Sequence, residues 1–405
     1  MKFLRVVFLF VNLSAFSQPL LVNNDMYAFV KSTAYDSINN KIYFNVINGC
    51  PTWGIPCALN YSLFSQHSLI NMHNYTDNDL QSVQGSKYQV AGPIYPVSEF
   101  TDGVAIQSRH QDNSIYSNFG YYFNRINEDL NLPGTIWSYT PATNPSYKQI
   151  STFEIKGDSV FLFERDSSST INYYSVFVKN KISGGNIPFN SLLASSTSNS
   201  LGAIEGKITS SVRVNDKIVL AGMFTASVSG NYIGRNLVYL NTTTGQLSPA
   251  PVTFTAGSAI YDMKIHNNKI HIAGLFAQVN NKWRNNYAVL DYNLNLKNDS
   301  CYFNGDFAMN TYLTKIAFYD KYMIALGNYW AVAGNQFAFF FNIFTIKAVD
   351  LTNNTVMPWT FSVSGYPIIY KDQLFDMHKN KLYIKRRDNN AAEFLVYCFE
   401  PVNTS

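Results

Sequence analysis

The sequence predicts an all-β chain folded as a single seven-bladed β-propeller, and three observations lead to this prediction. Aromatic residues form 16% of the 405 residues, a composition typical of sheets, because aromatic side chains pack well on a pleated surface. Charged residues form only 14%, against about 25% in ordinary globular chains. A turn-and-strand pattern recurs about every fifty-five residues along almost the whole chain.

Each copy of this pattern is a polar turn, usually containing lysine, followed by a strand with alternating apolar residues. Asparagine and aspartate tolerate the backbone of a tight turn, and alternation directs one face of the strand inward, so each copy predicts a β-hairpin. The clear copies are Asn40–Tyr43, Asp216–Val219, Asn268–His271 and Asn380–Tyr383, and the looser ones are Ser86–Gln89, Asp158–Phe161 and Asp320–Met323.

The strand after the turn ends in small residues in the best copies, Leu220–Gly222 and Ile272–Gly274. Such residues are expected to let the inner strands crowd toward a central axis. A third strand follows, for example Asn236–Leu240, and the turn Thr243–Gln246 leads into a fourth. Four antiparallel strands in each of seven repeats predict a propeller. A β-solenoid has shorter repeats, and tandem sandwiches need about a hundred residues each.

We expect residues 18–405 to form the propeller. The blades are expected at roughly 27–80, 81–147, 148–205, 206–258, 259–310, 311–365 and 366–405. The seventh repeat stops after its third strand, Glu393–Phe399. The strand at 19–22 is therefore expected to complete the last blade, because a closed ring leaves no free strand edge.

Residues 1–17 have the three parts of a secretory signal peptide. Lys2 and Arg5 carry positive charge, Val6–Leu13 is apolar, and Ala15–Ser17 has the small residues of a cleavage site. The apolar run is too short to cross a bilayer, which takes about twenty residues. We therefore expect a protein that is secreted or lies on the outer cell surface, without a membrane span.

The cysteines fit an oxidising compartment. Cys50 and Cys57 bracket a short loop, and a disulfide between them would stabilise the fold by about 2–3 kcal/mol. A metal site would need further ligands nearby, and none is evident. Cys301 and Cys398 fall in repeats that are not neighbours in a seven-bladed ring, so we expect both to be unpaired and mostly buried.

Two copies of the repeat resemble a known family. Ala221–Thr225 and Ala273–Ala277 each precede a polar loop, which Arg235–Leu240 and Asn285–Leu290 follow. This pattern resembles the delta-60-type and kelch-like propeller repeats of secreted and cell-surface proteins, in two of the seven copies. The resemblance implies a scaffold for surface adhesion or recognition.

No catalytic, metal or cofactor site is recognisable. A net charge of +4 is too small and too evenly spread to predict nucleic-acid binding. Asp77–Asp79 lacks the glycine and distal glutamate of a calcium loop. His266 and His271 face each other across a hairpin, but two ligands do not make a metal site. The 26 acidic residues offer no pair that can be chosen for glycoside cleavage, so catalysis is not expected.

Aromatic residues on loops are the remaining functional signal. The step from Lys87 to Ser159 is 72 residues, which predicts an insertion at Phe100–Tyr147. Flat aromatic side chains suit stacking on sugar rings or a protein hot spot, and they equally suit filling gaps between blades. The candidate ligand-binding residues are Trp53, Tyr122, Trp137, Tyr139 and Trp283.

The sequence therefore predicts an exported, non-catalytic propeller that binds a glycan or a surface protein through loops on one face. A propeller hydrolase or lyase acting on polysaccharide is the first alternative, and a structural spacer in a larger surface assembly is the second. The centre of the ring distinguishes the first two. Two carboxylates, or a histidine with a carboxylate, within hydrogen-bond range there would favour the enzyme.

Overall fold

The computed structural model describes a chain made of β-strands, and no described residue is helical. None of the described residues belongs to a helix that could cross a membrane. The described residues are 20–21, 28–38, 41–48, 67–72, 87–90, 107–118, 123–127, 135–141, 148–166, 173–189, 203–228, 230–298, 312–332, 340–363, 375–378, 380–388 and 391–399.

The strands form antiparallel sheets of three or four members, nearly all consecutive in the chain. The sheets from the first half are β2 (Ala28–Asp36), β3 (Lys41–Asn48), β4 (His67–Met72) and β5 (Lys87–Val90); β6 (Gln107–Gln111), β7 (Ser114–Asn118), β8 (Phe123–Asn127) and β9 (Thr135–Tyr139); and β10 (Lys148–Lys156), β11 (Ser159–Asp166) and β12 (Tyr173–Asn180).

The second half of the chain continues the same plan. Its sheets are β13 (Ala203–Val214), β14 (Lys217–Val228), β15 (Asn231–Asn241) and β16 (Leu247–Pro249); β17 (Ala259–His266), β18 (Lys269–Leu275) and β21 (Tyr287–Leu290); β22 (Tyr312–Tyr319), β23 (Tyr322–Val332), β24 (Phe340–Asp350) and β25 (Thr355–Val363); and β26 (Phe375–His378), β27 (Lys381–Asp388), β28 (Ala391–Cys398) and β1 (Leu20–Leu21). A separate ribbon holds β19 (Gln278–Val279) and β20 (Lys282–Trp283).

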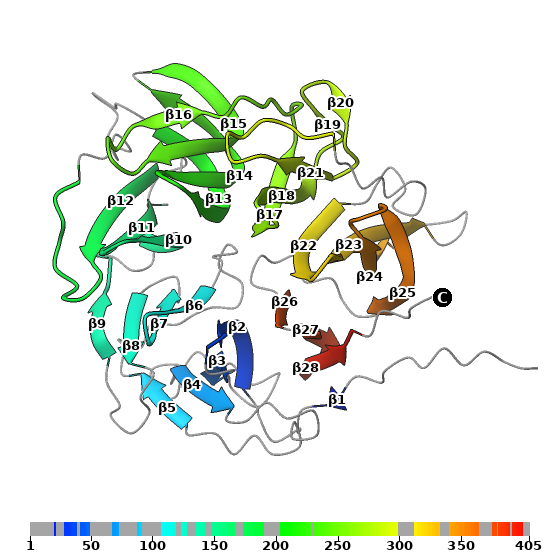
Figure 1. Ribbon diagram of the computed structural model, residues 1–405, viewed down its shortest axis with the longest axis horizontal. Coiled ribbons are helices and arrows are strands. Elements are labelled where there is room, and N and C mark those ends of the chain that lie inside the picture. Colours follow the sequence, from blue (N-terminus) through cyan, green and yellow to red (C-terminus); the bar gives the residue numbers. More distant parts are fainter. Residues whose placement is uncertain are drawn as a thin grey trace, which may run out of the picture.

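The sheets stand around a common centre (Figure 1). The innermost strand is β26 in the sheet that contains β1, and it is the first strand in the chain in each of the other sheets of the ring. The innermost strands are β2, β6, β10, β13, β17, β22 and β26. This arrangement is a β-propeller, so the predicted all-β class and propeller architecture are confirmed.

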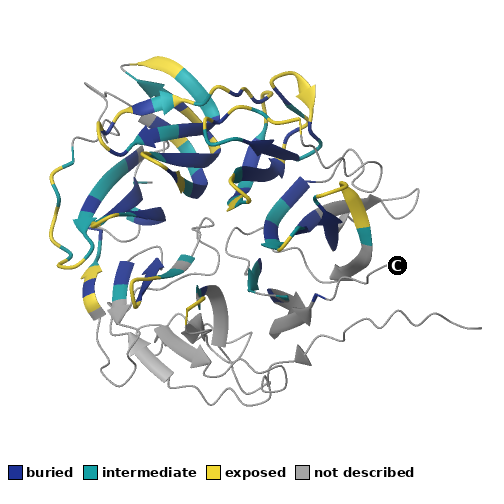
Figure 2. Cartoon of the chain, viewed as in Figure 1, coloured by how far each residue is buried: buried dark blue, intermediate teal, exposed yellow. Residues whose placement is uncertain are grey.

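Apolar side chains fill the spaces between successive sheets. One buried cluster joins Phe163 of β11 to Leu220 of β14, and the next joins Val219 of β14 to Ile272 of β18. Buried residues accordingly concentrate within the sheets, whereas exposed residues lie at turns, on parts of the outer strands and on the β19–β20 ribbon (Figure 2). Each of these sheets therefore buries its apolar faces only because it has neighbours.

A β-bulge interrupts five of the innermost strands at a matching place. The bulges fall between Val30 and Ser32, Ile150 and Thr152, Ile208 and Ser210, Ile260 and Asp262, and Leu313 and Lys315. A bulge adds one residue to a strand and changes the direction in which the following side chains point. The bulge in the backbone therefore determines the direction in which the polar side chains that follow it point.

Glycine is required on the partner strand opposite two of these bulges. Gly222 pairs with Ile208, and Gly274 pairs with Ile260. A Cβ atom at Gly274 would lie 2.0 Å from the carbonyl oxygen of Ala259, and one at Gly222 would approach its own inner strand equally closely. The small residues predicted at these positions are therefore present. They are needed because any side chain there would collide with the carbonyl oxygen of the residue that precedes the bulge.

One predicted copy of the repeat is wrong. Lys87–Val90 is β5, which pairs with β4 at the end of its sheet, so Ser86–Gln89 is not a turn between first and second strands. The equivalent turn of the next sheet is Asp112-Asn113, where both residues have positive φ, 51° and 52°. No lysine follows this turn, and the sequence pattern therefore missed it.

The expected insertion at Phe100–Tyr147 is also wrong for the described residues, because β6–β9 within it form a four-stranded sheet. Its aromatic side chains Tyr116 and Phe123 are fully buried against Phe153 of the next sheet. The 72-residue step arose from the misplaced turn at Ser86–Gln89, which precedes the real one.

The first and last described strands, β1 and β28, lie in one sheet. Leu20 of β1 pairs with Val396 of β28, and the sheet runs β1-β28-β27-β26. Residues 1–17 and the cysteines Cys50, Cys57 and Cys301 lie outside the described residues. Cys398 lies in β28, opposite Lys381.

Replacing Gly274 by alanine is expected to destabilise the fold by about 1–3 kcal/mol, because the new methyl group collides with backbone that cannot move aside. Urea denaturation of the Gly274→Ala variant measures this loss. Gly185→Ala is the matched control, since its Cβ would meet only the Ser183 hydroxyl at 3.3 Å. Equal stability of the two variants would contradict the close approach.

Candidate functional site

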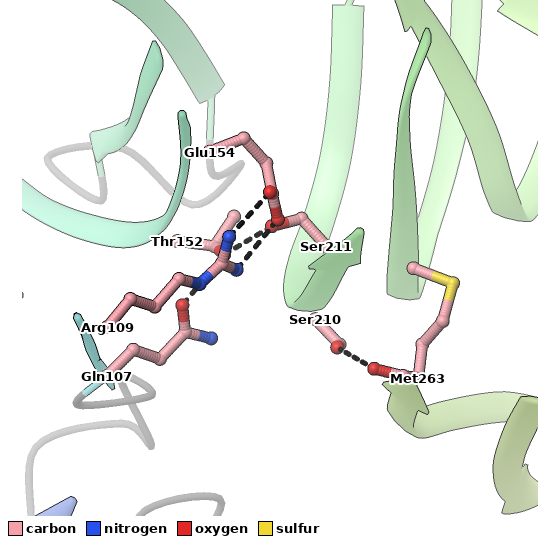
Figure 3. Close-up of polar contacts among 7 residues, drawn as sticks. All are labelled: Gln107, Arg109, Thr152, Glu154, Ser210, Ser211 and Met263. Carbon is pink, nitrogen blue, oxygen red and sulfur yellow. Dashed lines mark hydrogen bonds and ion pairs between the residues drawn. The ribbon is translucent and has the colours of Figure 1, made fainter. Parts of the chain in front are cut away.

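The innermost strands bring charged side chains together at the centre of the ring. Arg109 of β6 donates two hydrogen bonds to Glu154 of β10, from Nη1 to Oε2 at 2.6 Å and from Nη2 to Oε1 at 2.8 Å (Figure 3). The Glu154 side chain is 3% exposed and that of Arg109 is 36% exposed. A bidentate pair of this kind fixes both orientation and charge.

Hydroxyl groups complete the surroundings of this pair. Ser211 of β13 donates to Glu154 Oε1 at 2.6 Å, so the buried carboxylate accepts three hydrogen bonds. Thr152 lies 2.6 Å from Ser211 and 3.2 Å from Oε1 of Gln107. The single Ser211 proton goes to the carboxylate, so Thr152 donates to Ser211. The Gln107 amide is therefore best oriented with its NH₂ group, rather than its oxygen, toward Thr152, so that Gln107 donates the hydrogen bond and the Thr152 hydroxyl accepts it.

The Arg109 guanidinium remains charged in this setting. Burial lowers its pKa, but the Glu154 carboxylate raises it by more, and the net pKa lies above the ordinary value. The guanidinium also lies over the Phe153 ring, 4.9 Å from the ring centre. Two of its five N–H donors are used by Glu154, and part of the side chain stays in contact with solvent.

A second ion pair is formed by later sheets. Lys264 of β17 lies 3.8 Å from Asp376 of β26, with side chains 42% and 27% exposed. Asp262 raises the pKa of Lys264 most, and Asp376 adds to this effect, against burial and the charge of Arg109. Asp262 is held in turn by the backbone N–H groups of Met263 and Ile316, each at 3.0 Å.

The members of the two ion pairs, Arg109, Glu154, Lys264 and Asp376, occupy equivalent positions in their sheets. Each lies two residues before the last paired residue of its first hairpin, as the cross-strand partners show. The equivalent pairs are Ala34–Tyr43, Arg109–Tyr116, Glu154–Phe161, Val212–Val219, Lys264–His271, Ala317–Ile324 and Asp376–Tyr383. We call these seven first-strand residues the central layer. It contains two cations and two anions, each next to a charge of the opposite sign.

His378 follows Asp376 by two residues on β26 and belongs to the same face of that strand. Its ring lies 5.1 Å from that of Tyr35 and 5.6 Å from that of Tyr383. Burial lowers the pKa of His378 more than Asp376 raises it, and Lys264 lowers it further. The imidazole is therefore neutral at pH 7.

Hydroxyl groups of β13 also connect neighbouring innermost strands. Thr209 donates to the Ile260 carbonyl at 2.7 Å. Ser210 donates to the Met263 carbonyl at 3.3 Å (Figure 3). Thr209 also contacts the Ala221 carbonyl at 3.1 Å within its own sheet. These residues hold β13 beside β17 and so position the central layer.

Of the three predicted aromatic residues that the structure describes, Trp137 and Tyr139 belong to one apolar cluster, whereas Trp283 lies on the β19–β20 ribbon. Trp53 and Tyr122 lie outside the described residues. Trp137 is 8% exposed, donates from Nε1 to the Lys181 carbonyl at 2.9 Å, and packs directly on Gly184. Its position is that of a packing residue.

Tyr139 is half-buried, and its hydroxyl donates to Glu164 at 2.7 Å. Burial, followed by this hydrogen bond and the charge of Glu164, raises the pKa of Tyr139. Trp283 differs from the other described candidates because it is 62% exposed. It pairs with Gln278 in the β19–β20 ribbon, whose turn is Asn280-Asn281.

Sequence inspection missed the central layer, although a signal for it exists. Arg109, Glu154, Lys264 and Asp376 each lie at a fixed distance before a hairpin turn. Finding them requires the turns to be aligned correctly, and the misplaced turn at Ser86–Gln89 concealed Arg109. Among the described residues, no group of three or more His, Cys, Asp or Glu side chains could hold a metal ion.

No family model matches the sequence, and no curated protein matches it. Among solved structures, the chain is similar to the extracellular domain of the putative one component system BT4673 from B. thetaiotaomicron, at 10% identity and a TM-score of 0.44, covering 94% of this chain. The match spans 40% of that protein's length.

Two further solved structures show similarity. Hsv2 from Kluyveromyces lactis matches at 7% identity and a TM-score of 0.39, over 92% of this chain and 98% of that one. The WD40 domain of SCAP from fission yeast matches at 9% identity and a TM-score of 0.34, over 95% of this chain and 98% of that one.

A double-mutant cycle on Arg109 and Glu154 is expected to give a coupling energy of about 1–3 kcal/mol, because removing one partner leaves the other charge poorly solvated. Solvent access to Arg109 keeps the value below that of a fully buried pair. Urea denaturation of Arg109→Met, Glu154→Gln and the double variant measures it. The exposed pair Lys297–Asp291 is the control, with an expected coupling below about 1 kcal/mol.

Proposed function

We propose that this chain is an exported, non-catalytic, seven-bladed β-propeller that binds a glycan or a surface protein. The observation that carries the proposal is the pairing of charges in the central layer. Glycoside cleavage uses two carboxyl groups that flank the scissile bond. Glu154 instead accepts hydrogen bonds from Arg109 and Ser211, and Asp376 faces Lys264. Their charges are neutralised by cations rather than directed at each other.

The proposed contact face is the end of the ring where the second strand of each sheet connects to the third. Trp283 lies on such a connection, between β18 and β21, and Tyr232 lies just after the one between β14 and β15. Both side chains are largely exposed. Trp53 and Tyr122 fall at the corresponding places in the chain, between β3 and β4 and between β7 and β8. Exposed aromatic rings on a rigid ring are suited to sugars and to protein hot spots.

Export and closure complete the proposal. The signal peptide at 1–17 would direct the chain outside the cell, and a Cys50–Cys57 disulfide would brace the connection that carries Trp53. The pairing of β1 with β28 supports the role of the N-terminal strand in closing the ring. Adhesion and a spacer role in a surface assembly fit the same scaffold, and the binding experiment distinguishes them.

Replacing Trp283 by alanine is expected to weaken binding at least tenfold, since truncating a tryptophan at the centre of a contact costs about 2 kcal/mol or more. Glycan arrays and pull-downs from cell-surface extracts with the mature protein would first identify the partner, and titration would then measure the loss. Ile182→Ala is the control, because Ile182 is as exposed as Trp283 but follows the third strand of its sheet. Binding that survives Trp283→Ala and also Trp53→Ala would refute the aromatic face.

Deleting residues 18–24 is expected to lower the melting temperature by several degrees, because the edge of β28 loses its partner β1. Thermal unfolding followed by circular dichroism measures the change. A variant lacking residues 401–405 serves as the control for shortening the chain. An unchanged melting temperature after the N-terminal deletion would contradict closure by β1.

A polysaccharide lyase or hydrolase remains the second candidate, and one observation favours it. His378 is neutral and lies beside Asp376, with Lys264 nearby at the centre of the ring. A neutral imidazole can abstract a proton, and a lysine can neutralise the carboxylate of an acidic sugar. Incubation with acidic polysaccharides, followed by absorbance of unsaturated products and by reducing-end analysis, tests both reactions. Activity that disappears in His378→Ala would replace the binding proposal.

A further inference from the structure

The sheet that contains β13, β14 and β15 extends further than the next sheet at the end of the ring that forms the proposed contact face. Gly222 and Gly274 occupy equivalent places in the two sheets, each opposite the residue before a bulge. β14 continues to Val228, six residues beyond Gly222, whereas β18 ends at Leu275, one residue beyond Gly274. The β17–β21 sheet, which stands beside the longer sheet in the ring (Figure 1), is therefore too short to cover all of it.

The side of β14 that faces the shorter sheet changes from buried to exposed along the strand. Val219, Ala221 and Met223 lie on this side, because side chains alternate along a strand. Val219 and Ala221 are fully buried against the β17–β21 sheet. Met223, which is level with the last residue of β18, is 40% exposed. The opposite side of β14 stays covered, since Phe224 is buried against the preceding sheet.

The strands on either side of β14 contribute to the uncovered side. Lys207 of β13 pairs with Met223, and Thr225 pairs with Glu205 of β13 and with Arg235 of β15. Residues paired directly across antiparallel strands point to the same side of the sheet. Farther along, Ser227 pairs with Tyr232. We call the following seven residues the open face: Glu205, Lys207, Met223, Thr225, Ser227, Tyr232 and Arg235.

Large apolar side chains are exposed on the open face and at the adjoining end of the next sheet. Tyr232 and Met223 belong to the open face and are 60% and 40% exposed. Leu275 occupies in β18 the place that Met223 has in β14, and Trp283 lies on the connection that follows β18. Both are also exposed. Exposed apolar side chains that gather in one place, rather than singly, are typical of an interaction surface.

The open face carries more positive than negative charge. Arg235 donates from Nε to the Tyr232 hydroxyl at 3.2 Å, and its guanidinium lies over the Tyr232 ring, 5.9 Å from the ring centre. The two terminal nitrogens of Arg235 have no hydrogen-bond or ion-pair partner among the described residues. Lys207 adds a second cation, and Glu205 is the one carboxylate of the open face. The face can therefore accept a further carboxylate at Arg235.

We propose that the open face binds a protein segment that presents a carboxylate beside an apolar side chain. The carboxylate would pair with Arg235, and the apolar side chain would pack on Met223 and Tyr232. This inference rests on the proposed function and narrows its partner to an acidic protein. Arginine, methionine and aromatic residues are enriched in protein interfaces. A sugar ring is favoured less, because the guanidinium of Arg235 already lies over the Tyr232 ring.

Panning of a phage library of short random peptides on the immobilised mature protein, followed by titration of the enriched peptides in synthetic form, tests the proposal. Enriched peptides are expected to carry aspartate or glutamate next to an aromatic or aliphatic residue. Their affinity is expected to fall as salt is added, because ion pairs at an exposed face are screened. Light scattering tests for a second copy on the open face, and a dimer that dissociates in Met223→Ser would overturn the proposal.

Variants place the peptide on the open face. Arg235→Gln is expected to weaken the peptide about tenfold, because a charged hydrogen-bond donor is lost. Met223→Ser is expected to weaken it about fivefold through loss of apolar contact. Glu205→Gln is expected to strengthen it roughly threefold, a gain that partial unfolding cannot produce. Arg213→Gln is the control, since Arg213 is exposed at the other end of β13 and carries the same charge.

The binding results also separate this inference from the proposed function. A glycan that binds and is lost in Tyr232→Ala, with no peptide enriched, would overturn this inference and leave the proposed function standing. Acidic peptides that need Arg235 but not Trp283 would support this inference and refute the role proposed for Trp283. Absence of both peptide and glycan binding would refute both. Enriched peptides without acidic residues, or an affinity unchanged in Arg235→Gln and Met223→Ser, would also overturn the inference.

Discussion

The packing of one sheet against the next is the constraint on which this structure depends. Every buried cluster in the described chain draws its members from two successive sheets, as Val219 and Ile272 or Tyr287 and Met323 illustrate. A single sheet would leave both apolar faces in water. The bulges and the glycines opposite them follow from this demand, because the innermost strands must approach closely without losing their hydrogen bonds.

Charge at the centre is a consequence of the same geometry. The repeat places one residue of each first strand in the central layer, so a charge there faces its counterparts from other sheets. Arg109 with Glu154, and Lys264 with Asp376, satisfy this arrangement in pairs, while the other three members of the layer, Ala34, Val212 and Ala317, are small and apolar. The centre is thus polar and electrically balanced, which suits contact with a polar partner.

The sequence predicted the class of fold well because hairpin turns are local. Asn267-Asn268 and Asn215 adopt the positive φ that their residue types allow, and alternation marked the strands beside them. The turn Asp112-Asn113 has the same backbone conformation, but no lysine follows it. A search based on lysine therefore placed the second repeat too early in the sequence. The strands of the second sheet, with their buried aromatic residues, were then mistaken for an insertion. Trp137 could not be told from Trp283 by sequence, because exposure depends on which neighbour, such as Gly184, covers a side chain. The central layer depends on the alignment of seven turns, and no local signal supplies it.

The junction of β1 with β28 has a consequence for how the chain is made. Residue 20 leaves the ribosome long before residue 396, and the contact between their strands is one of the most distant in the sequence among the described residues. Contacts of this separation form slowly, because the intervening chain must be ordered first. Until β28 has been synthesised, β1 lacks the strand with which it pairs, and the growing structure is an open arc with two exposed strand edges. A chaperone that shields strand edges would therefore matter most in the interval just before the final sheet closes.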